Sequence, residues 1–392
     1  MSKRVGMEVS IAVAEAVRLA NVDVVAAYPI TPQTHIVEHL SELVADGDLD
    51  AEFVCVESEH SAMSACLGSS AAGARSFTAT ASQGLALMHE ILFIAPAMRL
   101  PIVMTVANRA LSGPLSIWND HSDVMASRDC GWIQYFVENG QEAFDHVLIA
   151  FRAAEDPAVL LPAIVNLDGF ILSHMIEPHV LMEQEEADRF LPPFQPRYRL
   201  DPDKPLTMGD FAMPDIYTEI KNAQEVALRD SRAVIDRVWQ QFGDLTGRRY
   251  KAVETYKAEG AEVLLLTMGS VGETASVAVD RMREAGLPVG LVKLRLWRPF
   301  PAEDLRRILG PVRKLVVVDR AISFGAGTNP VAAEITTQLY DLDPRPRVFN
   351  AVVGLGGRDV RAKDLEEILE RALKADGRPA PVGAYDLIGV RE

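Results

Sequence analysis

The sequence is poor in cysteine, and this excludes one class of cofactor site. It has three cysteines, Cys55, Cys66 and Cys130, and no two of them form a C-x-x-C pair. Three widely spaced thiols cannot supply the four ligands of an iron–sulfur cluster. We therefore interpret them as small, buried apolar residues.

Long apolar runs are also missing. No run approaches the roughly 18 to 20 apolar residues that a membrane-spanning helix needs. The first residues, Met-Ser-Lys-Arg-Val-Gly, pass directly into an amphipathic pattern, without a signal-peptide core or a small-residue cleavage site. We therefore expect a cytoplasmic protein with no membrane partner.

Positive charge is scarce as well. The 39 Lys and Arg residues stand against 55 Asp and Glu, which gives a formal net charge of −16. A protein that binds nucleic acid needs a basic face, so nucleic acid is not an expected partner. An acidic protein would need a locally basic patch to dock on this surface.

The 392 residues are 48% hydrophobic and 24% charged, the composition of an ordinary globular protein. Short β-rich runs alternate with helical periodicity, which predicts the α/β class with parallel sheets covered by helices on both faces. Prolines crowd the stretch after residue 177, and a second alternating unit begins near residue 261. The predicted divisions are a first domain over 1–176, an irregular segment with a long linker helix over 177–258, a smaller α/β domain over 259–375, and a loose tail over 376–392.

The most informative segment is the turn that follows the first buried strand, Tyr28-Pro-Ile-Thr-Pro32. Pro32 suits the first position of a helix, which would make Thr31 its N-cap. The Thr31 hydroxyl then either caps the helix, worth about 1 kcal/mol, or receives a carboxylate together with the free N–H groups of the first turn. The pattern alone leaves both readings open.

A second candidate follows the next strand. Glu59 is predicted in the first turn of a helix, where an acid either compensates the helix dipole or serves a ligand at the carboxyl end of the sheet. Glu57 lies two residues earlier, and position alone does not separate the two glutamates.

Two further strand ends carry polar residues. Ser82-Gln83-Gly84 follows one predicted strand, and Asn108-Arg109 follows the next. Gly84 permits a close backbone approach, and an arginine can grip a carboxylate through two parallel hydrogen bonds. A plain loop and a surface ion pair are the alternatives. Because the loops at one sheet edge converge in space, four such strand ends together favour a shared site.

Other motifs carry weaker signals. The loop Trp118–Asp123 could bind a metal, but an active-site flap or a subunit contact explains it better. His35 and His39 have a spacing that suits zinc, yet they lack the glutamate of H-E-x-x-H, so solvated or partner-facing histidines are the simpler interpretation. Residues 323–329 and 354–358 are rich in glycine without a G-x-G-x-x-G fingerprint, which indicates turns at an interface.

Taken together, several motifs resemble the alpha subunit of heteromeric 2-oxoacid:ferredoxin oxidoreductases, and most closely the pyruvate type. The resemblance extends over nearly the whole chain and rests on these motifs: Tyr28-Pro-Ile-Thr-Pro32, Glu57-Ser-Glu-His-Ser-Ala62, Thr80-Ala-Ser-Gln-Gly84, Ala107-Asn-Arg109, Trp118-Asn-Asp-His-Ser-Asp123, Val292-Lys-Leu-Arg-Leu-Trp-Arg-Pro-Phe300, Asp319-Arg-Ala-Ile-Ser-Phe324 and Gly354-Leu-Gly-Gly-Arg-Asp359.

The resemblance implies a pyrimidine-binding domain of the thiamine-enzyme type, followed by a transketolase C-terminal-like domain. It also implies a reaction in which thiamine diphosphate decarboxylates pyruvate, CoA takes the acetyl group, and electrons reach ferredoxin through iron–sulfur clusters. Glu59 would bond N1′ of the cofactor and promote the tautomer that activates it. Thr31 and Arg109 would bind the substrate carboxylate. The residues implied to line the cofactor are Tyr28, Pro29, Glu59, Ser82 and Gln83.

One family element is absent. Thiamine enzymes hold Mg²⁺ and the diphosphate with a Gly-Asp-Gly motif and a later Asn, and this sequence contains no Gly-Asp-Gly. We therefore expect no metal ligand on this chain and no activity from the chain alone. A beta subunit would bind Mg²⁺ and the diphosphate, and gamma and ferredoxin-like delta subunits would complete the complex.

Several alternatives remain open from the sequence. The substrate could be another 2-oxo acid, either aromatic such as phenylglyoxylate, branched-chain or dicarboxylic, and NAD could be the final acceptor. A non-catalytic scaffold subunit and a nucleotide-binding dehydrogenase are readings from other classes. The absence of a dinucleotide fingerprint counts against the dehydrogenase.

Overall fold

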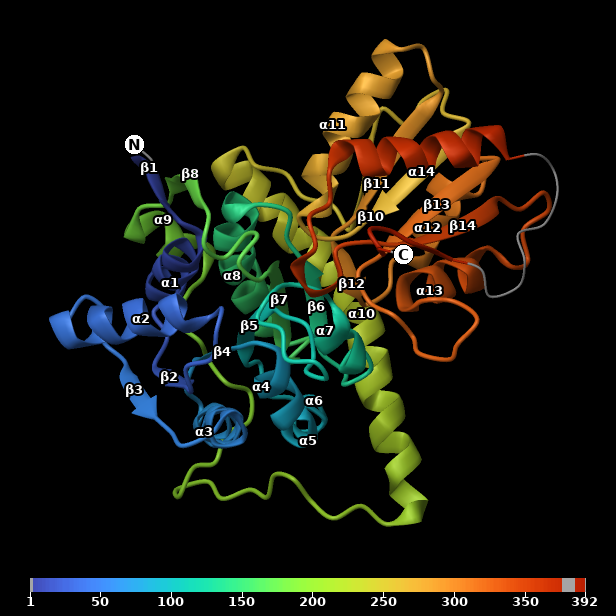
Figure 1. Ribbon diagram of the computed structural model, residues 1–392. Helices are drawn as coiled ribbons and strands as arrows, with labels where there is room; N and C mark the ends of the chain where they lie inside the picture. The colour runs from blue at the N-terminus through green and yellow to red at the C-terminus, as the bar shows by residue number, and fades with distance from the viewer. Residues whose placement is uncertain (1–2, 376–384, 392) are drawn as a thin grey trace.

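The computed structural model describes residues 3–375 and 385–391, which form three sheets (Figure 1). The largest sheet has seven strands in the order β12-β6-β7-β5-β4-β2-β3. Neighbouring strands are parallel except for β12, which runs antiparallel to β6. The strands are β2 (Val24–Ala27), β3 (Glu52–Cys55), β4 (Ser76–Thr80), β5 (Val103–Asn108), β6 (Ile133–Phe136), β7 (Ala163–Asp168) and β12 (Leu296–Arg298).

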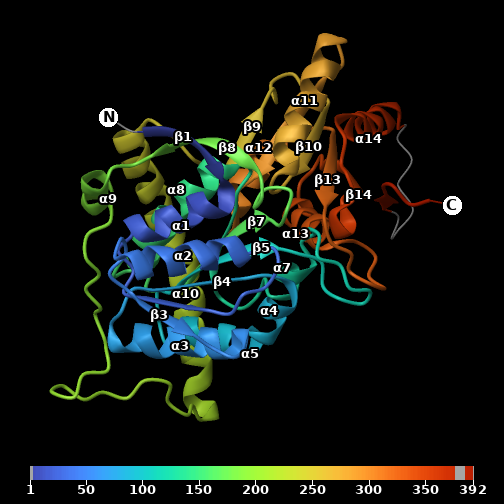
Figure 2. The ribbon, with the colours of Figure 1, turned by 60° about the vertical axis from the view of Figure 1, so that its left-hand side comes forward.

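Helices cover both faces of this sheet, as the alternating pattern predicts. In Figure 2, α1 and α2 lie on one side of β3 and β4, and α3 and α5 lie on the other. Helix α8 packs against α1 and also against β5 and β7. The helices of this part are α1 (Val9–Leu19), α2 (Thr34–Asp46), α3 (Glu59–Ala72), α4 (Ser82–Leu87), α5 (His89–Leu92), α6 (Ile94–Ala97), α7 (Ser122–Ala126) and α8 (Gly140–Ala154).

Three differences from the expected elements stand out. The sequence pattern predicts one helix over residues 84–98, whereas the structure has the three short helices α4, α5 and α6 there. A strand was not expected before residue 9, yet β1 (Lys3–Glu8) pairs antiparallel with β8 (Ile176–Leu181). The proline-rich stretch after residue 177 contains that strand and α9 (Gln184–Phe190), because its prolines concentrate only beyond residue 191.

The second alternating unit forms a six-stranded sheet in the order β15-β14-β13-β10-β11-β9. Helices α11 (Val271–Glu284) and α14 (Ala362–Lys374) pack against each other, as do α12 (Ala302–Leu309) and α13 (Pro330–Leu339). The strands are β9 (Val253–Tyr256), β10 (Val263–Thr267), β11 (Val289–Leu294), β13 (Lys314–Asp319), β14 (Arg347–Val352) and β15 (Asp386–Leu387). The loose tail expected over 376–392 falls partly outside the described residues, and its described part includes β15, which pairs with β14.

The two large sheets share one core. Buried residues from β10 and β11 belong to the same apolar cluster as those of β4, β5 and β7. Strand β12 follows β11 directly and joins the seven-stranded sheet, so the segment predicted as a separate domain over 259–375 supplies one strand to the other unit. The long helix α10 (Pro214–Thr246), which connects the two units, packs against α8 and α6. Within the described ranges, no helix is both long and apolar enough to cross a bilayer.

Candidate functional site

The predicted site residues gather at the carboxyl-terminal edge of the seven-stranded sheet. Thr31 follows β2, Glu59 follows β3, Ser82 follows β4 and Arg109 follows β5. Because these strands are parallel and adjacent, their ends meet at one edge, where open α/β sheets bind ligands.

The turn around Thr31 differs from its expected form. The Gln33 N–H donates to the Ile30 carbonyl at 2.9 Å, and the Thr31–Pro32 peptide bond is cis. This turn occupies residues 30–33, so α2 begins only at Thr34, with Gln33 at the N-cap position. The prediction that Thr31 caps the helix and Pro32 begins it is therefore wrong. The Thr31 side chain is exposed at the sheet edge and does not close the helix.

The structure distinguishes Glu59 from Glu57 by burial. Glu59 is the first residue of α3, whose N-cap is Ser58, and its side chain is only 7% exposed. No described residue donates a hydrogen bond to its carboxylate. Glu57 is exposed and accepts a hydrogen bond from Ser61 Oγ at 2.6 Å, and this bond lowers the pKa of Glu57. Glu59 is therefore the buried acid that is free to bind a ligand.

Gly84 lies in close contact with this acid. A Cβ atom built on Gly84 would lie 2.8 Å from Glu59 Oε1 and would also collide with Thr80 Oγ1. Real Cβ atoms do not approach a carboxylate so closely, so α4 can lie against Glu59 only because residue 84 lacks a side chain. Thr80 Oγ1 is itself buried without a hydrogen-bond partner among the described residues. We call this closely packed group of Glu59, Thr80 and Gly84 the polar cradle.

Asp123 joins two of the strand ends. Its Oδ2 accepts the backbone N–H groups of Ser82 and Arg109, each at 3.0 Å. Its Oδ1 accepts Asn108 Nδ2 at 3.1 Å and the Val124 N–H at 2.7 Å. Burial raises the pKa of Asp123 to about 7, although these donors favour its charged form. This buried carboxylate fixes the positions from which Ser82 and Arg109 extend.

Arg109 lies against Thr31. Its Nη1 donates to the Thr31 carbonyl at 2.9 Å, and its Nε donates to the Ser116 carbonyl at 2.8 Å. Burial lowers the pKa of Arg109, and the nearby Asp123 opposes that effect. Within the described chain Nη2 has no hydrogen-bond partner, so this edge of the guanidinium remains free for an anion.

The remaining predicted residues border the same edge. Tyr28 and Pro29 are exposed in the turn before Thr31. Ser82 is buried, and its Oγ lies 2.6 Å from both the Ala110 carbonyl oxygen and Gln83 Oε1. Gln83 is half-buried. The sequence therefore located the edge correctly, and the roles of the individual residues stay predictions.

The loop Trp118–Asp123 lies between the two large sheets. Asp168, at the end of β7, accepts hydrogen bonds from Asn119 Nδ2 at 3.0 Å and pairs with His121 Nε2 at 2.8 Å. From the second unit, Arg320 Nη1 reaches the same carboxylate at 2.6 Å, and Ser270 also donates to it. Burial opposes ionisation of Asp168, but Arg320 and His121 outweigh it and hold its pKa well below the usual range.

Sequence reasoning missed Asp123 and Asp168 as individual site residues. Asp168 ends a predicted strand, so the rule that selected Arg109 could also have selected it. The expectation that the glycine-rich segment 354–358 is a turn at an interface agrees with the structure, since the N–H groups of Gly357 and Gly356 donate to Asn119 O at 2.6 Å and Asp120 Oδ2 at 3.2 Å.

His35 and His39 do not act as a pair. His35 Nδ1 lies 2.6 Å from Glu8 Oε1, whereas His39 Nε2 lies 3.0 Å from Glu15 Oε1. The two rings therefore contact different acids and do not form a shared zinc motif.

Comparisons with known proteins agree with this architecture. Residues 15–239 match the family model described as pyruvate flavodoxin/ferredoxin oxidoreductase, thiamine diphosphate-binding. Residues 261–365 match the model described as pyruvate:ferredoxin oxidoreductase core domain II. The first match contains all the predicted site residues.

Curated relatives cover almost the full chain. Pyruvate synthase subunit PorA of Methanothermobacter thermautotrophicus is 51% identical over 92% of this chain and 93% of its own length. PorA of Pyrococcus furiosus is 47% identical over 98% of this chain and 97% of its own. Ketoisovalerate oxidoreductase subunit VorA of Pyrococcus horikoshii is 45% identical over 90% of this chain and 89% of its own.

A solved structure shows the same fold. The 2-oxoglutarate:ferredoxin oxidoreductase of Magnetococcus marinus aligns with a TM-score of 0.73 at 20% identity, and the alignment covers 95% of this chain and 66% of that one. A split-gene transketolase aligns with a TM-score of 0.55 at 13% identity. These likenesses confirm the predicted α/β fold, and the two family models confirm a thiamine-enzyme domain followed by a smaller second unit.

Proposed function

The chain belongs to the pyruvate flavodoxin/ferredoxin oxidoreductase family, and from this premise we propose that it is the alpha subunit of an enzyme that oxidatively decarboxylates pyruvate. In this reaction pyruvate and CoA give acetyl-CoA, CO₂ and two electrons, and the electrons leave through iron–sulfur clusters to ferredoxin. This chain would hold the aminopyrimidine half of thiamine diphosphate and the carboxylate of the substrate.

The observation that carries the proposal is the cradle formed by Glu59 and Gly84. A buried carboxylate that accepts no hydrogen bond from the described residues, next to a position where a side chain would collide, suits the N1′ edge of an aminopyrimidine ring. Thiamine diphosphate, when bound, would supply a nucleophilic carbon and an electron sink for decarboxylation. The residues of this chain therefore fit the pyrimidine half of the cofactor.

Glu59 would hold a proton at N1′ of the pyrimidine. Because Glu59 is buried, its hydrogen bond to a ring nitrogen would be stronger than the same bond in solvent. Gly84 lets α4 lie directly against the carboxylate, and Asp123 holds the neighbouring strand ends at fixed positions. Tyr28, Pro29, Ser82 and Gln83 would border the cofactor.

Arg109 and Thr31 would bind the carboxylate of the 2-oxo acid. The guanidinium is fixed by the Thr31 and Ser116 carbonyls and keeps Nη2 available. Thr31, whose backbone carbonyl accepts from Arg109 Nη1, is an exposed residue at the same sheet edge. A charged donor and a hydroxyl at one sheet edge suit a small anionic substrate.

The opposite wall of the site would come from another chain. The sequence holds no Gly-Asp-Gly for Mg²⁺ and the diphosphate. Exposed apolar side chains also surround the site edge, and such a patch marks a surface that another molecule covers. Its members are Tyr28, Leu115, Ile117, Trp118 and Ile171.

We therefore infer a complex in which a beta subunit binds Mg²⁺ and the diphosphate and completes the site. Iron–sulfur clusters would lie on partner subunits, including a ferredoxin-like delta subunit, since three scattered cysteines cannot hold one here. A gamma subunit would complete the assembly. The cytoplasmic location stays a prediction.

The choice of substrate rests on the relatives. The pyruvate synthase relatives are 44% to 51% identical to this chain, and the ketoisovalerate relative is 45% identical. Pyruvate is the proposed substrate because relatives at 51%, 49% and 47% identity are all pyruvate synthase subunits. Because one relative is a ketoisovalerate oxidoreductase subunit, a branched 2-oxo acid is the alternative substrate to test.

Purification of the native complex tests the proposal. The complex should reduce a viologen dye when given pyruvate and CoA, with a higher kcat/KM for pyruvate than for 2-oxoisovalerate, phenylglyoxylate or 2-oxoglutarate. The isolated chain should show no turnover. Tight binding of thiamine diphosphate and decarboxylation by the isolated chain would contradict the divided site.

A further inference from the structure

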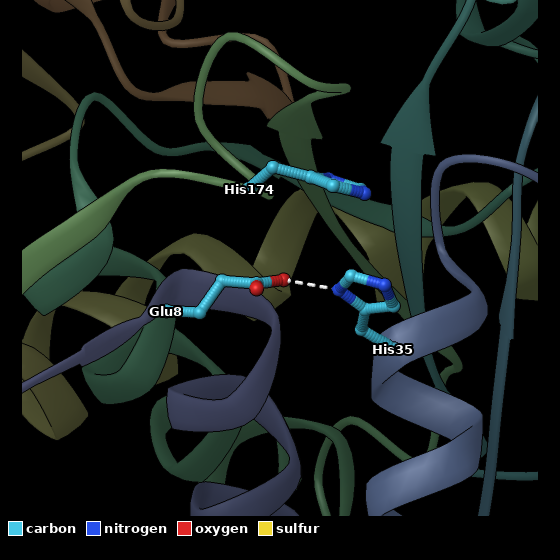
Figure 3. Close-up of side chains that lie close together, drawn as sticks. All are labelled: Glu8, His35 and His174. Carbon is cyan, nitrogen blue, oxygen red and sulfur yellow. Dashed lines mark hydrogen bonds and ion pairs between the residues drawn. The ribbon is translucent and has the colours of Figure 1, made fainter.

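Three ligand-capable side chains meet away from the Glu59 site, at the junction of three segments. Glu8 ends β1, His35 lies in the first turn of α2, and His174 lies in the turn between β7 and β8. One carboxylate oxygen of Glu8 and one ring nitrogen of each histidine all lie within 4.8 Å of one another. Figure 3 shows the ring of His174 over the Glu8–His35 pair.

From this geometry we propose that Glu8, His35 and His174 bind a divalent transition-metal ion such as Zn²⁺. Two imidazoles and one carboxylate are a donor set that zinc takes, with a fourth position left for water. In such a site Zn–N distances are about 2.0–2.1 Å, which places the ligand atoms about 3.4 Å apart. Small side-chain movements would bring this cluster to that spacing.

The contacts of the three residues fit this role. His35 Nδ1 lies 2.6 Å from Glu8 Oε1, and a metal ion would replace the proton that they share. Glu8 has no arginine or lysine partner in the described ranges, so its charge is available to a cation. The side chains are reachable from solvent, at 42% exposure for His35 and 22% for Glu8.

A hydrogen bond with Ser173 orients the ring of His174. Its Nδ1 lies 2.8 Å from Ser173 Oγ, which also accepts the Phe170 N–H at 2.9 Å. Protein metal ligands are commonly oriented by such an outer hydrogen bond, which fixes the ring and its tautomer.

A bound ion would stiffen the wall that carries Thr31 and Arg109. The rings of His35, His174, Phe170 and Trp118 form a continuous series, with centroids 4.6, 4.5 and 4.6 Å apart. The backbone of Gly169, in the same turn, lies against Pro32. The ion would thus connect the start of α2 to the loop whose Ser116 carbonyl holds Arg109.

Metal titration of the full chain, without an affinity tag and after treatment with a chelator, tests the proposal. We expect one Co²⁺ per chain, with the visible absorption of a tetrahedral or five-coordinate nitrogen–oxygen site, and displacement of Co²⁺ by Zn²⁺. Zn²⁺ should also raise the melting temperature, because it binds only the folded chain. These readouts are independent of catalytic turnover.

Matched variants locate the ion. His35→Gln and His174→Gln should each weaken binding by more than about 100-fold, the upper end of the loss caused by removing even an outer partner of a ligand. Ser173→Ala should weaken it by about 10- to 100-fold. The control His39→Gln lies one turn along the same helix and contacts a different acid, so it should leave the affinity unchanged.

Two results would overturn the proposal. One is the absence of saturable Co²⁺ or Zn²⁺ binding to the natural chain. The other is binding that His39→Gln weakens as much as His35→Gln does, or that the Ser173→Ala variant leaves unaltered. Circular dichroism identifies any variant that fails to fold, and in that case the natural chain and Ser173→Ala decide the question.

Discussion

Arg109 is the residue whose contacts define the substrate side of the site. Two of its nitrogens donate to the carbonyls of Thr31 and Ser116, while Nη2 stays free. The sequence predicted this arginine from its position after a strand, since strand ends at one sheet edge converge. It could not predict the two carbonyl partners, because Ser116 belongs to an irregular loop without periodicity.

Replacing Arg109 by lysine tests this arrangement. Lysine keeps the charge, but it cannot reach two carbonyls and a substrate carboxylate at the same time. Hydrogen bonds to charged groups contribute about 1.5–3 kcal/mol, which corresponds to a rise in KM for the 2-oxo acid of about 10- to 150-fold. Steady-state kinetics of the reconstituted complex measure it, with the apparent KM for CoA as the internal control. An equal rise in both values would argue against contact with the carboxylate.

At the scale of elements, the close packing of α4 on α3 depends on Gly84. The sequence identified the glycine, and its physical reason appears only in the structure, where Glu59 and Thr80 fill the space around it. The sequence also predicted a helix over residues 59–72, because Gly73 is a typical residue after the end of a helix, and α3 has these bounds. It was wrong about the start of α2, because the turn at residues 30–33 is closed by a backbone hydrogen bond that no side-chain pattern reveals.

We expect Gly84→Ala to damage the cradle. The added methyl group would collide with Glu59 and Thr80, and overpacking of this kind costs about 1–3 kcal/mol of stability. Affinity of the reconstituted complex for thiamine diphosphate should fall as well. The matched control is Gly68→Ala on the exposed side of α3, where a methyl group meets nothing within 4 Å. Equal behaviour of the two variants, by denaturant unfolding and cofactor titration, would refute the steric argument.

The contact between α8 and α10 predicts a pH dependence. His146 is buried, donates from Nδ1 to the Glu142 carbonyl, and accepts from Trp239 Nε1 at Nε2. Burial lowers the pKa of His146 from 6.5 to about 4. Below pH 6.5 the unfolded chain therefore binds a proton that the folded chain rejects, so stability falls as the pH drops from 6.5 to about 4.

The expected loss over this range is about 3 kcal/mol, at about 1.4 kcal/mol for each pKa unit. Urea unfolding at several pH values measures it. His146→Gln should flatten the slope, while the same change at the half-exposed His60 should leave it as it is. An unaltered slope in the His146 variant would assign the acid sensitivity to other groups.

At the scale of the whole molecule, the two α/β units share a core, a strand and buried ion pairs. Strand β12 crosses to the larger sheet, and Asp168 receives Arg320 and Ser270 from the second unit. A further buried pair, Arg295 with Glu142 at 2.6 Å, joins the units near α8. The sequence predicted the two alternating units from their periodicity. It could not predict this exchange, because a three-residue strand and single buried ion pairs leave no periodic pattern.

The central claim is that this chain forms one wall of a thiamine diphosphate site and that Glu59 binds N1′ of the cofactor. The most direct test is the rate of dye reduction by the reconstituted complex with pyruvate and CoA, compared between Glu59→Gln and Glu57→Gln. The account predicts a fall of about 10²- to 10⁴-fold for Glu59→Gln, the usual contribution of a positioned acid–base group, and a rate near that of the natural chain for Glu57→Gln. A Glu59→Gln complex that keeps its full rate would contradict the account.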